Sequence, residues 1–337
     1  MFISFLGTSS GTPTKQRNVT GIALQSARHK RWYLIDCGEG TQHQLLHTAL
    51  SIRYLSAILI THVHGDHCYG LPGLLASATM HGRTEPLLII APAAIEQWLT
   101  QTLELSQARL SYRITYIAIE SLTAPAPVSL PDFQVQAIAL SHRVPSYAFR
   151  FEENPTKPTI KLNQDKLKAD QIARGAVWGR LQRGETVTLE DGRILNPKDY
   201  LINNSASVPR AVIIGGDNDT PELLVPYLNQ VQVVVHEATY TQAIADKVGP
   251  NPQHSSAKQV AQFAEHYQVP NLVLTHFSAR YSADVSPLAE EARLYYHGAL
   301  FLAHDFQTYH LDTQNVLSLV VDEEPLVSAL EVDDLTS

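Results

Sequence analysis

The chain is organised around one segment, Leu55-Ser-Ala-Ile-Leu-Ile-Thr-His-Val-His-Gly-Asp-His-Cys-Tyr-Gly-Leu-Pro-Gly-Leu-Leu75. Its first residues are apolar or small and include the β-branched Ile58, Ile60 and Thr61, a pattern that predicts a short buried strand. Four possible metal ligands follow within six residues, namely His62, His64, Asp66 and His67. Imidazole nitrogens and carboxylate oxygens are the usual zinc ligands other than thiolates. The segment therefore predicts a metal site at the end of a buried strand.

The spacing of these ligands indicates two adjacent metal ions. His62 and His64 stand at i and i+2 just past the strand, so their side chains point to one side. Asp66 and His67 are neighbours in sequence and cannot easily face the same ion. A single His-X-His pair is more often an ordinary pair of histidines than a metal site. Four donors in this order, directly after a buried strand, are far less often accidental.

Strand patterns elsewhere in the chain also end in ligand-type side chains. Asp36 follows Trp32–Ile35, His142 follows Phe133–Leu140, Asp217 follows Ala211–Ile214, Glu237 lies just past Val231–Val235, and His276 follows Leu272–Leu274. Helical patterns at Thr41–Leu50 and Ala93–Leu105 separate the strands, which predicts an α/β fold. Scaffolds of this class gather such side chains at one edge of the sheet.

Two of these carboxylates have specific expected tasks. Two cations about 3.5–4 Å apart need a bridging carboxylate to offset their repulsion, and Asp217 is the best candidate. Metal-binding histidines usually donate their second ring N–H to a carboxylate or carbonyl. Asp36, at a strand end, is placed to accept such a hydrogen bond.

Length and composition indicate a soluble cytoplasmic protein. With 337 residues, 44% of them hydrophobic, the chain can bury a large core. Its only cysteines, Cys37 and Cys68, argue against a disulfide scaffold and fit a reducing compartment. The first residues lack the basic region of a signal peptide, and no run approaches the roughly 20 apolar residues of a membrane span. We expect no membrane partner.

The net charge of −8 is unevenly distributed. Seven acidic residues and no Lys or Arg occur from Asp312 to the end, so the rest of the chain is nearly neutral. Seven basic residues against two acidic ones lie between Lys157 and Arg183, and five basic and no acidic residues lie between Lys15 and Arg31. Each basic stretch has two equally good interpretations: a surface exposed to solvent, or a surface that contacts a phosphate backbone.

The ligand set His62-Val-His64-Gly-Asp66-His67, with His142, Asp217 and His276, resembles that of the metallo-β-lactamase superfamily. Further stretches resemble one family within it, ribonuclease Z, the endonucleases that remove 3′ trailers from precursor tRNA. These stretches are Phe5-Leu-Gly-Thr-Ser-Ser-Gly-Thr-Pro-Thr-Lys-Gln-Arg-Asn18, Asp36-Cys-Gly-Glu-Gly-Thr-Gln42, Thr61 to Leu75, Trp178-Gly-Arg-Leu-Gln-Arg-Gly184 with Val187-Thr-Leu-Glu-Asp-Gly192, His236-Glu-Ala-Thr-Tyr240, His254-Ser-Ser-Ala257 and Leu274-Thr-His-Phe-Ser-Ala-Arg-Tyr281. They span roughly residues 2 to 310.

The resemblance implies a four-layer αββα metallo-β-lactamase sandwich with a protruding arm insertion. It implies a catalytic domain over residues 1–310, a basic arm over 152–195 that grips the tRNA body, and an acidic tail over 311–337. The family is homodimeric, with the arm of one subunit serving the site of the other. Candidate RNA contacts are Lys15, Arg17, Asn18, Arg174, Gly175, Arg180, Arg183 and Arg280.

The resemblance also implies the chemistry. One Zn²⁺ would be held by His62, His64 and His142, a second by Asp66, His67 and His276, and Asp217 would be shared. A hydroxide between the ions would attack the phosphodiester and leave a 3′-hydroxyl on the tRNA, with Asp66 as proton acceptor. His254, oriented by Glu237, would protonate the leaving ribose oxygen. Mn²⁺ and Fe²⁺ suit the same ligands.

The sequence departs from the family in three places. Gly175-Ala176 stands where a Gly-Pro pair is expected, Asp217-Asn-Asp-Thr220 stands where Asp-Thr-Arg-Pro is usual, and the acidic tail has no counterpart. The first alternative function is therefore a phosphodiesterase of the same fold that acts on small or cyclic phosphodiesters. A glyoxalase-like thioesterase is a weaker alternative, because it has no use for the Pro13–Asn18 loop or the His254 stretch. An RNA-binding module with an inactive site is weaker too, because it would not keep all seven metal ligands.

Overall fold

The computed structural model describes residues 1–122, 126–155, 159–204 and 208–321. The chain forms two compact units. Unit 1 comprises residues 1–152 together with 210 onward, and unit 2 comprises Glu153–Pro209. Among the described residues, no helix is long and apolar enough to cross a membrane.

Unit 1 contains two large mixed β-sheets. The eight-stranded sheet has the order β21-β20-β1-β3-β4-β5-β6-β7. Its strands are β1 (Phe2–Gly7), β3 (Gly21–Gln25), β4 (Trp32–Ile35), β5 (Leu55–Leu59), β6 (Leu87–Ala91), β7 (Ile114–Ala118), β20 (Thr308–Leu311) and β21 (Leu317–Leu319). The seven-stranded sheet has the order β19-β17-β16-β15-β10-β9-β8. Its strands are β8 (Val128–Ser129), β9 (Phe133–Leu140), β10 (Ser146–Glu153), β15 (Ala211–Ile214), β16 (Val231–Glu237), β17 (Asn271–Thr275) and β19 (Ala299–Leu302).

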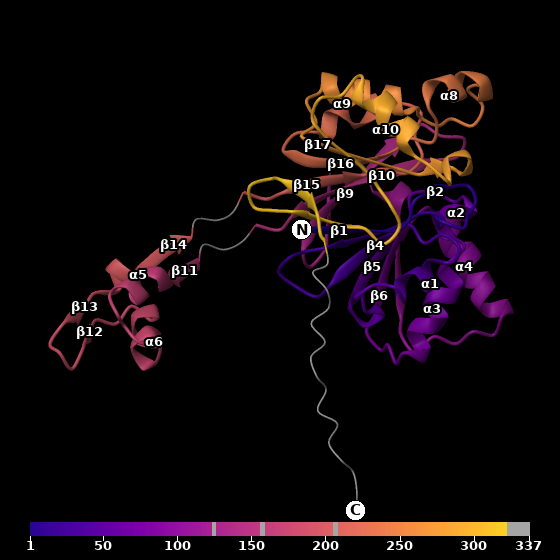
Figure 1. Ribbon diagram of the computed structural model, residues 1–337. Coiled ribbons are helices and arrows are strands. Elements are labelled where there is room, and N and C mark those ends of the chain that lie inside the picture. Colours follow the sequence, from indigo (N-terminus) through magenta and orange to yellow (C-terminus); the bar gives the residue numbers. More distant parts are fainter. Residues whose placement is uncertain (123–125, 156–158, 205–207, 322–337) are drawn as a thin grey trace, which may run out of the picture. The chain divides into compact units, whose positions relative to one another are not determined.

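The two sheets face each other across a shared apolar core. Phe5 and Tyr33 from the first sheet meet Phe149 and Val233 from the second in this core. The outer face of the first sheet packs against α3 (Leu71–Met80) and α4 (Ala93–Leu105). The outer face of the second packs against α9 (Ala257–His266) and α10 (Ser286–Arg293). Unit 1 is therefore an αββα sandwich, as Figure 1 shows.

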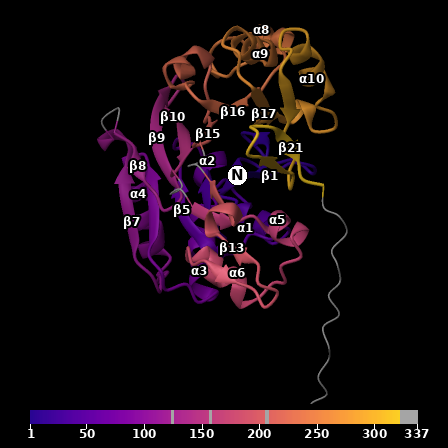
Figure 2. The same ribbon diagram turned by 90° about the vertical axis from the view of Figure 1, so that its left-hand side faces the viewer.

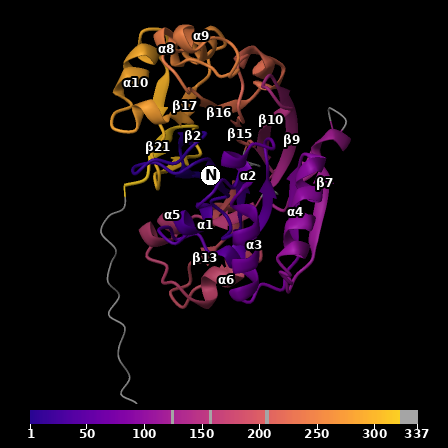
Figure 3. The ribbon, with the colours of Figure 1, turned by 90° about the vertical axis from the view of Figure 1, so that its right-hand side faces the viewer.

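Two rotated views confirm which helices cover which sheet. Helices α8 (Gln242–Val248), α9 and α10 lie over β16 and β17, while α4 lies beside β7 (Figures 2 and 3). Strands β15, β16, β17 and β19 are parallel neighbours, so their carboxyl ends meet at one edge. Strands β4 and β5 are likewise parallel, which places Asp36 and Thr61 at neighbouring strand ends.

Most sequence-predicted elements agree with the structure, and the differences have local causes. The helix expected over Thr41–Leu50 ends earlier, giving α1 (Thr41–Leu45). Beyond it, the amides of Leu46 and His47 bond to carbonyls three residues back, which closes the chain into tight turns. Leu46 is 72% exposed and gives no apolar contact that would extend the helix.

The predicted acidic tail begins inside the first sheet. Tyr309 pairs with Leu319, so the chain still belongs to the sheet well past Leu311. Residues 322–337, with six of the seven acidic side chains expected there, lie outside the described residues.

Unit 2 has a small core of its own. Its elements are β11 (Thr159–Leu162), α5 (Gln164–Ala169), α6 (Ala176–Gln182), β12 (Val187–Thr188), β13 (Ile194–Leu195), α7 (Pro197–Tyr200) and β14 (Leu201–Asn204). Leu167, Trp178 and Leu181 are buried together at its centre. The unit begins one residue later than the predicted arm over 152–195 and ends at Pro209 instead.

Candidate metal centre

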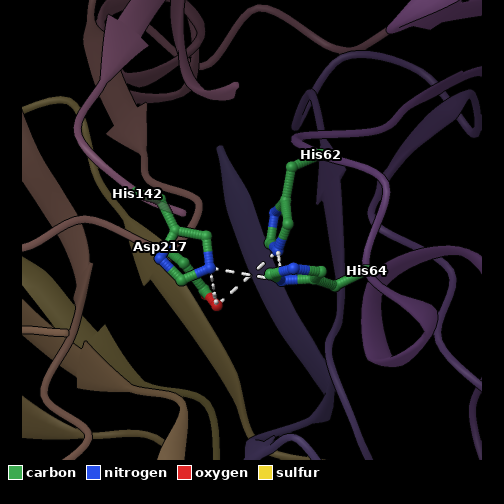
Figure 4. A group of neighbouring side chains, drawn as sticks. All are labelled: His62, His64, His142 and Asp217. Carbon is green, nitrogen blue, oxygen red and sulfur yellow. Dashed lines mark hydrogen bonds and ion pairs between the residues drawn. The ribbon is translucent and has the colours of Figure 1, made fainter. Parts of the chain in front are cut away.

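The first group of ligand-type side chains gathers three imidazoles and a carboxylate. Nδ1 of His64 lies 3.0 Å from Nε2 of His62 and 3.2 Å from Nε2 of His142. Oδ2 of Asp217 lies 3.6 Å from both of those Nε2 atoms. Figure 4 shows His62 and His64 converging from one segment with His142 and Asp217 from two others, with their nitrogens and the oxygen aimed at a common point.

A second group lies on the other side of Asp217. Nε2 of His67 and Nε2 of His276 are 3.3 Å apart, and Oδ2 of Asp66 lies 3.5 Å from each. Oδ1 of Asp217 lies 3.3 Å from the same two nitrogens. The two oxygens of Asp217 therefore face different groups, which is the geometry of a carboxylate shared between two sites.

The residues of the second group fit a bound cation. Nδ1 of His67 lies 2.7 Å from Oδ2 of Asp36, an acceptor, so the ring proton of a neutral His67 is on Nδ1 and its Nε2 carries a lone pair. His276 contacts the Thr239 hydroxyl through Nδ1, and that hydroxyl donates to Glu237. When both rings are neutral, their two Nε2 lone pairs face each other, and a cation between them satisfies both. In addition, the buried Oδ1 of Asp217 has no hydrogen-bond partner among the described residues.

Electrostatics favour positive charge between the groups. Burial lowers the pKa of His62 well below its ordinary value, and burial also lowers the pKa of His64 and His142, so these rings are neutral and able to coordinate. For His67, burial lowers the pKa, but the nearby carboxylates outweigh it and raise the pKa well above the ordinary value. The same field that holds a proton on His67 attracts a divalent ion in its place.

The His62–His67 segment is clamped by the chain around Asp36. Oδ1 of Asp36 accepts from the amide of Thr61 at 2.7 Å and Oδ2 from the hydroxyl of Thr61 at 2.9 Å. The Cys37 amide donates to the carbonyl of His67 at 2.8 Å. At Gly38 a Cβ would lie 2.3 Å from the carbonyl oxygen of Asp66, so only glycine permits this approach. The Asp36-Cys-Gly stretch thereby fixes both the backbone and one imidazole of the ligand segment.

His254 and Glu237 form a pair beside the second group. Nδ1 of His254 lies 2.9 Å from Oε1 of Glu237 and 3.9 Å from Oδ2 of Asp217. Burial lowers the pKa of His254, but Glu237 more than offsets it and raises the pKa to about 9. The ring is therefore protonated at neutral pH, with Nδ1 fixed by Glu237.

Asn218, directly after Asp217, connects three loops of the site by hydrogen bonds. It is not among the site residues predicted from the sequence. It is fully buried. Its amide donates to Glu237 Oε1 at 2.9 Å, its Oδ1 accepts from the amide of Ser141 at 3.2 Å, and its carbonyl accepts from Ser255 Oγ at 2.6 Å. Ser141 and Ser255 are neighbours of His142 and His254. The only sequence signal was the unusual Asp217-Asn-Asp-Thr220 stretch.

The predicted RNA contacts have different surroundings. Lys15 and Arg280 are exposed, and the Arg280 guanidinium lies over the Tyr240 ring. Arg17 is only 6% exposed and donates to Thr8 Oγ1 and the carbonyl of Ala303. Its guanidinium therefore holds the loop from within, and its contact with RNA stays a prediction.

Asn18 is tied into the same loop. Its amide donates to Asp305 Oδ2 at 2.6 Å and its side-chain amide to the carbonyl of Glu39 at 2.8 Å. In unit 2, Arg180 and Arg183 both pair with Glu185, while Arg174 and Gly175 are exposed.

The sandwich and the His/Asp cluster at its edge define a metal-dependent hydrolase of the metallo-β-lactamase fold. The crystal structure of human tRNase Z, short form, has this fold, with a TM-score of 0.62 at 24% identity over 93% of this chain and all of that chain. A family model described as Anti-Pycsar protein Apyc1 matches residues 1–173, the half that holds the His62–His67 segment and His142.

Relatives of full length narrow the class further. The ribonuclease Z of Marinobacter nauticus is 51% identical over 325 residues, covering 93% of this chain and 97% of its own. The ribonuclease Z of Pseudomonas putida is 50% identical over 323 residues, covering 94% and 99%. The chain belongs to the ribonuclease Z family, which confirms the predicted family and fold.

Proposed function

We propose that this protein is the endoribonuclease that removes the 3′ trailer from precursor tRNA. The observation that carries the proposal is the position of Asp217, whose two oxygens face two separate sets of metal ligands in a chain that aligns with ribonuclease Z over nearly its whole length. One ion would be held by His62, His64 and His142 and the other by Asp66, His67 and His276. The many imidazoles favour zinc, although Mn²⁺ and Fe²⁺ suit the same donors.

Two divalent ions, when bound, supply Lewis acidity that activates water and neutralises charge on the phosphodiester. Asp66 would take up the proton of the attacking water, because its carboxylate belongs to the ligand cluster. The amide of Gly11 donates to Asp66 Oδ2 at 2.7 Å and holds this carboxylate in position. Asp36 fixes the ring of His67 through Nδ1 and so keeps its Nε2 directed at the cluster.

His254 supplies a proton to the leaving group in this proposal. Glu237 holds Nδ1, which leaves Nε2–H as the transferable proton, and the raised pKa of about 9 keeps the ring charged at neutral pH. The leaving atom is the 3′ oxygen of the last tRNA nucleotide. Its protonation gives a tRNA that ends in a 3′-hydroxyl and a trailer that carries the phosphate.

We further propose that unit 2 is the tRNA-binding arm. Lys168 and Arg174 line a hollow of about 460 Å³ beside Trp178, a combination of cations and an aromatic ring that suits an RNA backbone. Neither cation has an ion pair among the described residues, in contrast to Arg180 and Arg183. We propose a homodimer in which this arm serves the partner's site, which light scattering would test.

We also propose that the enzyme works in the cytoplasm. Both cysteines are free and buried. Burial raises the pKa of the Cys68 thiol to about 12, so it is an inert thiol that suits a reducing compartment.

A pair of substrates tests the function and the arm together. The enzyme should cleave precursor tRNA with a 3′ trailer and also hydrolyse a small chromogenic phosphodiester. The double variant Lys168→Glu, Arg174→Glu should lose about 10-fold or more in kcat/KM on the precursor, since each phosphate contact adds to affinity. The single charge-reversal control Lys247→Glu, at an exposed position of α8, should behave as wild type. Equal cleavage of the precursor by all three proteins would overturn the role of the arm.

A further inference from the structure

A cavity in unit 1 has no part in the chemistry described above. Its volume is about 320 Å³. Three segments that are far apart in sequence line it: Gln16 and Arg17, residues 282–285, and the turn His304–Phe306. This is near the lower limit of ligand pockets, about 300 Å³, and suits a single nucleotide better than a duplex.

The cavity lies on the same sheet edge as the ligand cluster. Strand β19 is the parallel neighbour of β17, with Leu302 paired to Leu274. Beyond the strands, the amide of Ala303 still donates to the carbonyl of Leu274 at 2.8 Å. The turn His304–Phe306 therefore leaves β19 next to the point where His276 leaves β17, about 5 Å away by the usual spacing of strands.

One wall of the cavity presents a fixed hydrogen-bond donor. Nη2 of Arg17 lies 3.0 Å from Nδ1 of His304. Arginine can only donate, so Nδ1 is the acceptor and the proton of the neutral ring is on Nε2. Burial lowers the pKa of His304, with Arg17 acting in the same direction, which keeps the ring neutral. Among the described residues, Nε2 has no hydrogen-bond partner.

Phe306 supplies an exposed aromatic face at the mouth of the cavity. The side chain is 46% exposed and its φ is +68°, a left-handed conformation that is an outlier for a bulky residue. Two hydrogen bonds hold this turn: the amide of Phe306 donates to the carbonyl of Phe5 at 2.7 Å and that of Gln307 to the carbonyl of His304 at 3.1 Å. The ring also meets His47 edge to face at 5.4 Å. A strained backbone thus keeps an apolar ring in solvent, which is typical of a binding function.

We propose that this cavity binds one unpaired base of the RNA substrate, close to the scissile bond. The base would stack on Phe306 and accept a hydrogen bond from Nε2 of His304. Aromatic stacking with a polar donor at the base edge is how proteins hold unpaired nucleotides. Exposed Lys15, next to Gln16, is placed for the adjoining phosphate. The proposal rests on the proposed ribonuclease function and adds to it a site for a particular nucleotide.

The test combines Phe306 variants with precursor tRNAs that carry one abasic nucleotide at successive positions around the cut. Phe306→Ala should raise KM for the normal precursor about 5- to 150-fold, the range expected for loss of one stacked base, with less effect on kcat. Phe306→Tyr, which keeps the ring, should restore KM. With the precursor that lacks the bound base, wild type and Phe306→Ala should have the same KM. Tyr267→Ala, which removes another part-exposed ring, should leave all values at the wild-type level.

Two outcomes would overturn the cavity as a base site: an unchanged KM in Phe306→Ala, or no abasic position at which the two proteins become alike. If Phe306→Ala folds poorly, Phe306→Leu keeps the apolar bulk without the ring and gives the same comparison. Binding of a short fluorescent single-stranded RNA separates this proposal from the catalytic one. Weaker binding by the variant, in a protein that cleaves no precursor, would retain the cavity and reject the function; equal binding would reject the cavity.

Discussion

Replacing Asn218 should weaken both the fold and the site, because this buried residue hydrogen-bonds to three loops that are far apart in the sequence. Its side chain makes three hydrogen bonds: Oδ1 accepts from the amides of Ser141 and Thr220, each at 3.2 Å, and Nδ2 donates to Nε2 of His236 at 3.1 Å. Nδ1 of His236 donates to the carbonyl of Glu237, so Nε2 of the neutral ring can only accept.

The magnitude follows from those three bonds. Each is worth about 0.5–1.5 kcal/mol, and a buried group left without a partner costs about 1–3 kcal/mol. Because Thr220 is partly exposed and its amide can reach water, Asn218→Ala should lower the free energy of unfolding by about 2–4 kcal/mol. Asn218→Asp should cost at least as much, since a carboxylate would face the His236 lone pair and add negative charge beside Glu237. A shift of the loop that carries His142 should also lower kcat by about 10- to 100-fold.

Urea unfolding of chelator-treated protein measures the first effect without a contribution from bound ions. Turnover of a small chromogenic phosphodiester by metal-loaded protein measures the second. Asn229→Ala is the matched control, because Asn229 is exposed and its replacement should stay within about 0.5 kcal/mol of wild type. Wild-type stability of Asn218→Ala would refute the assignment of these bonds, and wild-type kcat in a destabilised variant would refute the link from Asn218 to the site.

Three further predictions concern acid stability, the leaving group and the metals. Asp132 is buried and accepts hydrogen bonds from Arg31 and Tyr33. Burial alone would raise the pKa of this carboxyl group, but the hydrogen bonds from Arg31, Tyr33 and His29 outweigh burial and lower the pKa below its ordinary value. Its ionised form therefore stabilises the fold above the unfolded pKa of about 3.9, and the stability difference between wild type and Asp132→Asn should shrink as urea titrations move below pH 4. His254→Ala should slow cleavage of precursor tRNA by about 10²- to 10⁴-fold but barely affect a nitrophenyl ester, whose leaving group needs no proton; equal losses on both substrates would exclude proton donation. Prolonged chelation should abolish turnover, and added zinc should restore it. By elemental analysis, Asp217→Asn should hold fewer than two metal ions per chain. Two tightly held ions in that variant would contradict a carboxylate shared between the two ions.

The sequence was sufficient to predict the elements that have a regular apolar pattern and the site residues that directly follow strands. Ala93–Leu105 and Phe133–Leu140 have the predicted bounds because continuous apolar periodicity ends at clear breaks. The positions of Glu237 and His276 follow from the parallel strands β16 and β17, whose carboxyl ends share an edge, and His62 and His142 also directly follow strand patterns in the sequence. Patterns of this kind are local and need no knowledge of the tertiary contacts.

What the sequence left open depends on contacts between distant segments. Arg17 reads as an exposed cation in a loop, yet its partners include the carbonyl of Ala303, nearly 300 residues away. The importance of Asn218 arises from bonds to Ser141 and Ser255, which no local pattern links. The left-handed backbone of Phe306 has no sequence signal either, because it is imposed by a bond to the carbonyl of Phe5.

The most direct test of the proposed function is to map, at nucleotide resolution, the cleavage of a precursor tRNA with a 3′ trailer by the metal-loaded protein. We predict a single cut after the discriminator base that leaves a 3′-hydroxyl on the tRNA and is lost in Asp217→Ala. An intact precursor, in the presence of good turnover of a small phosphodiester, would contradict it and would favour a phosphodiesterase for small or cyclic substrates.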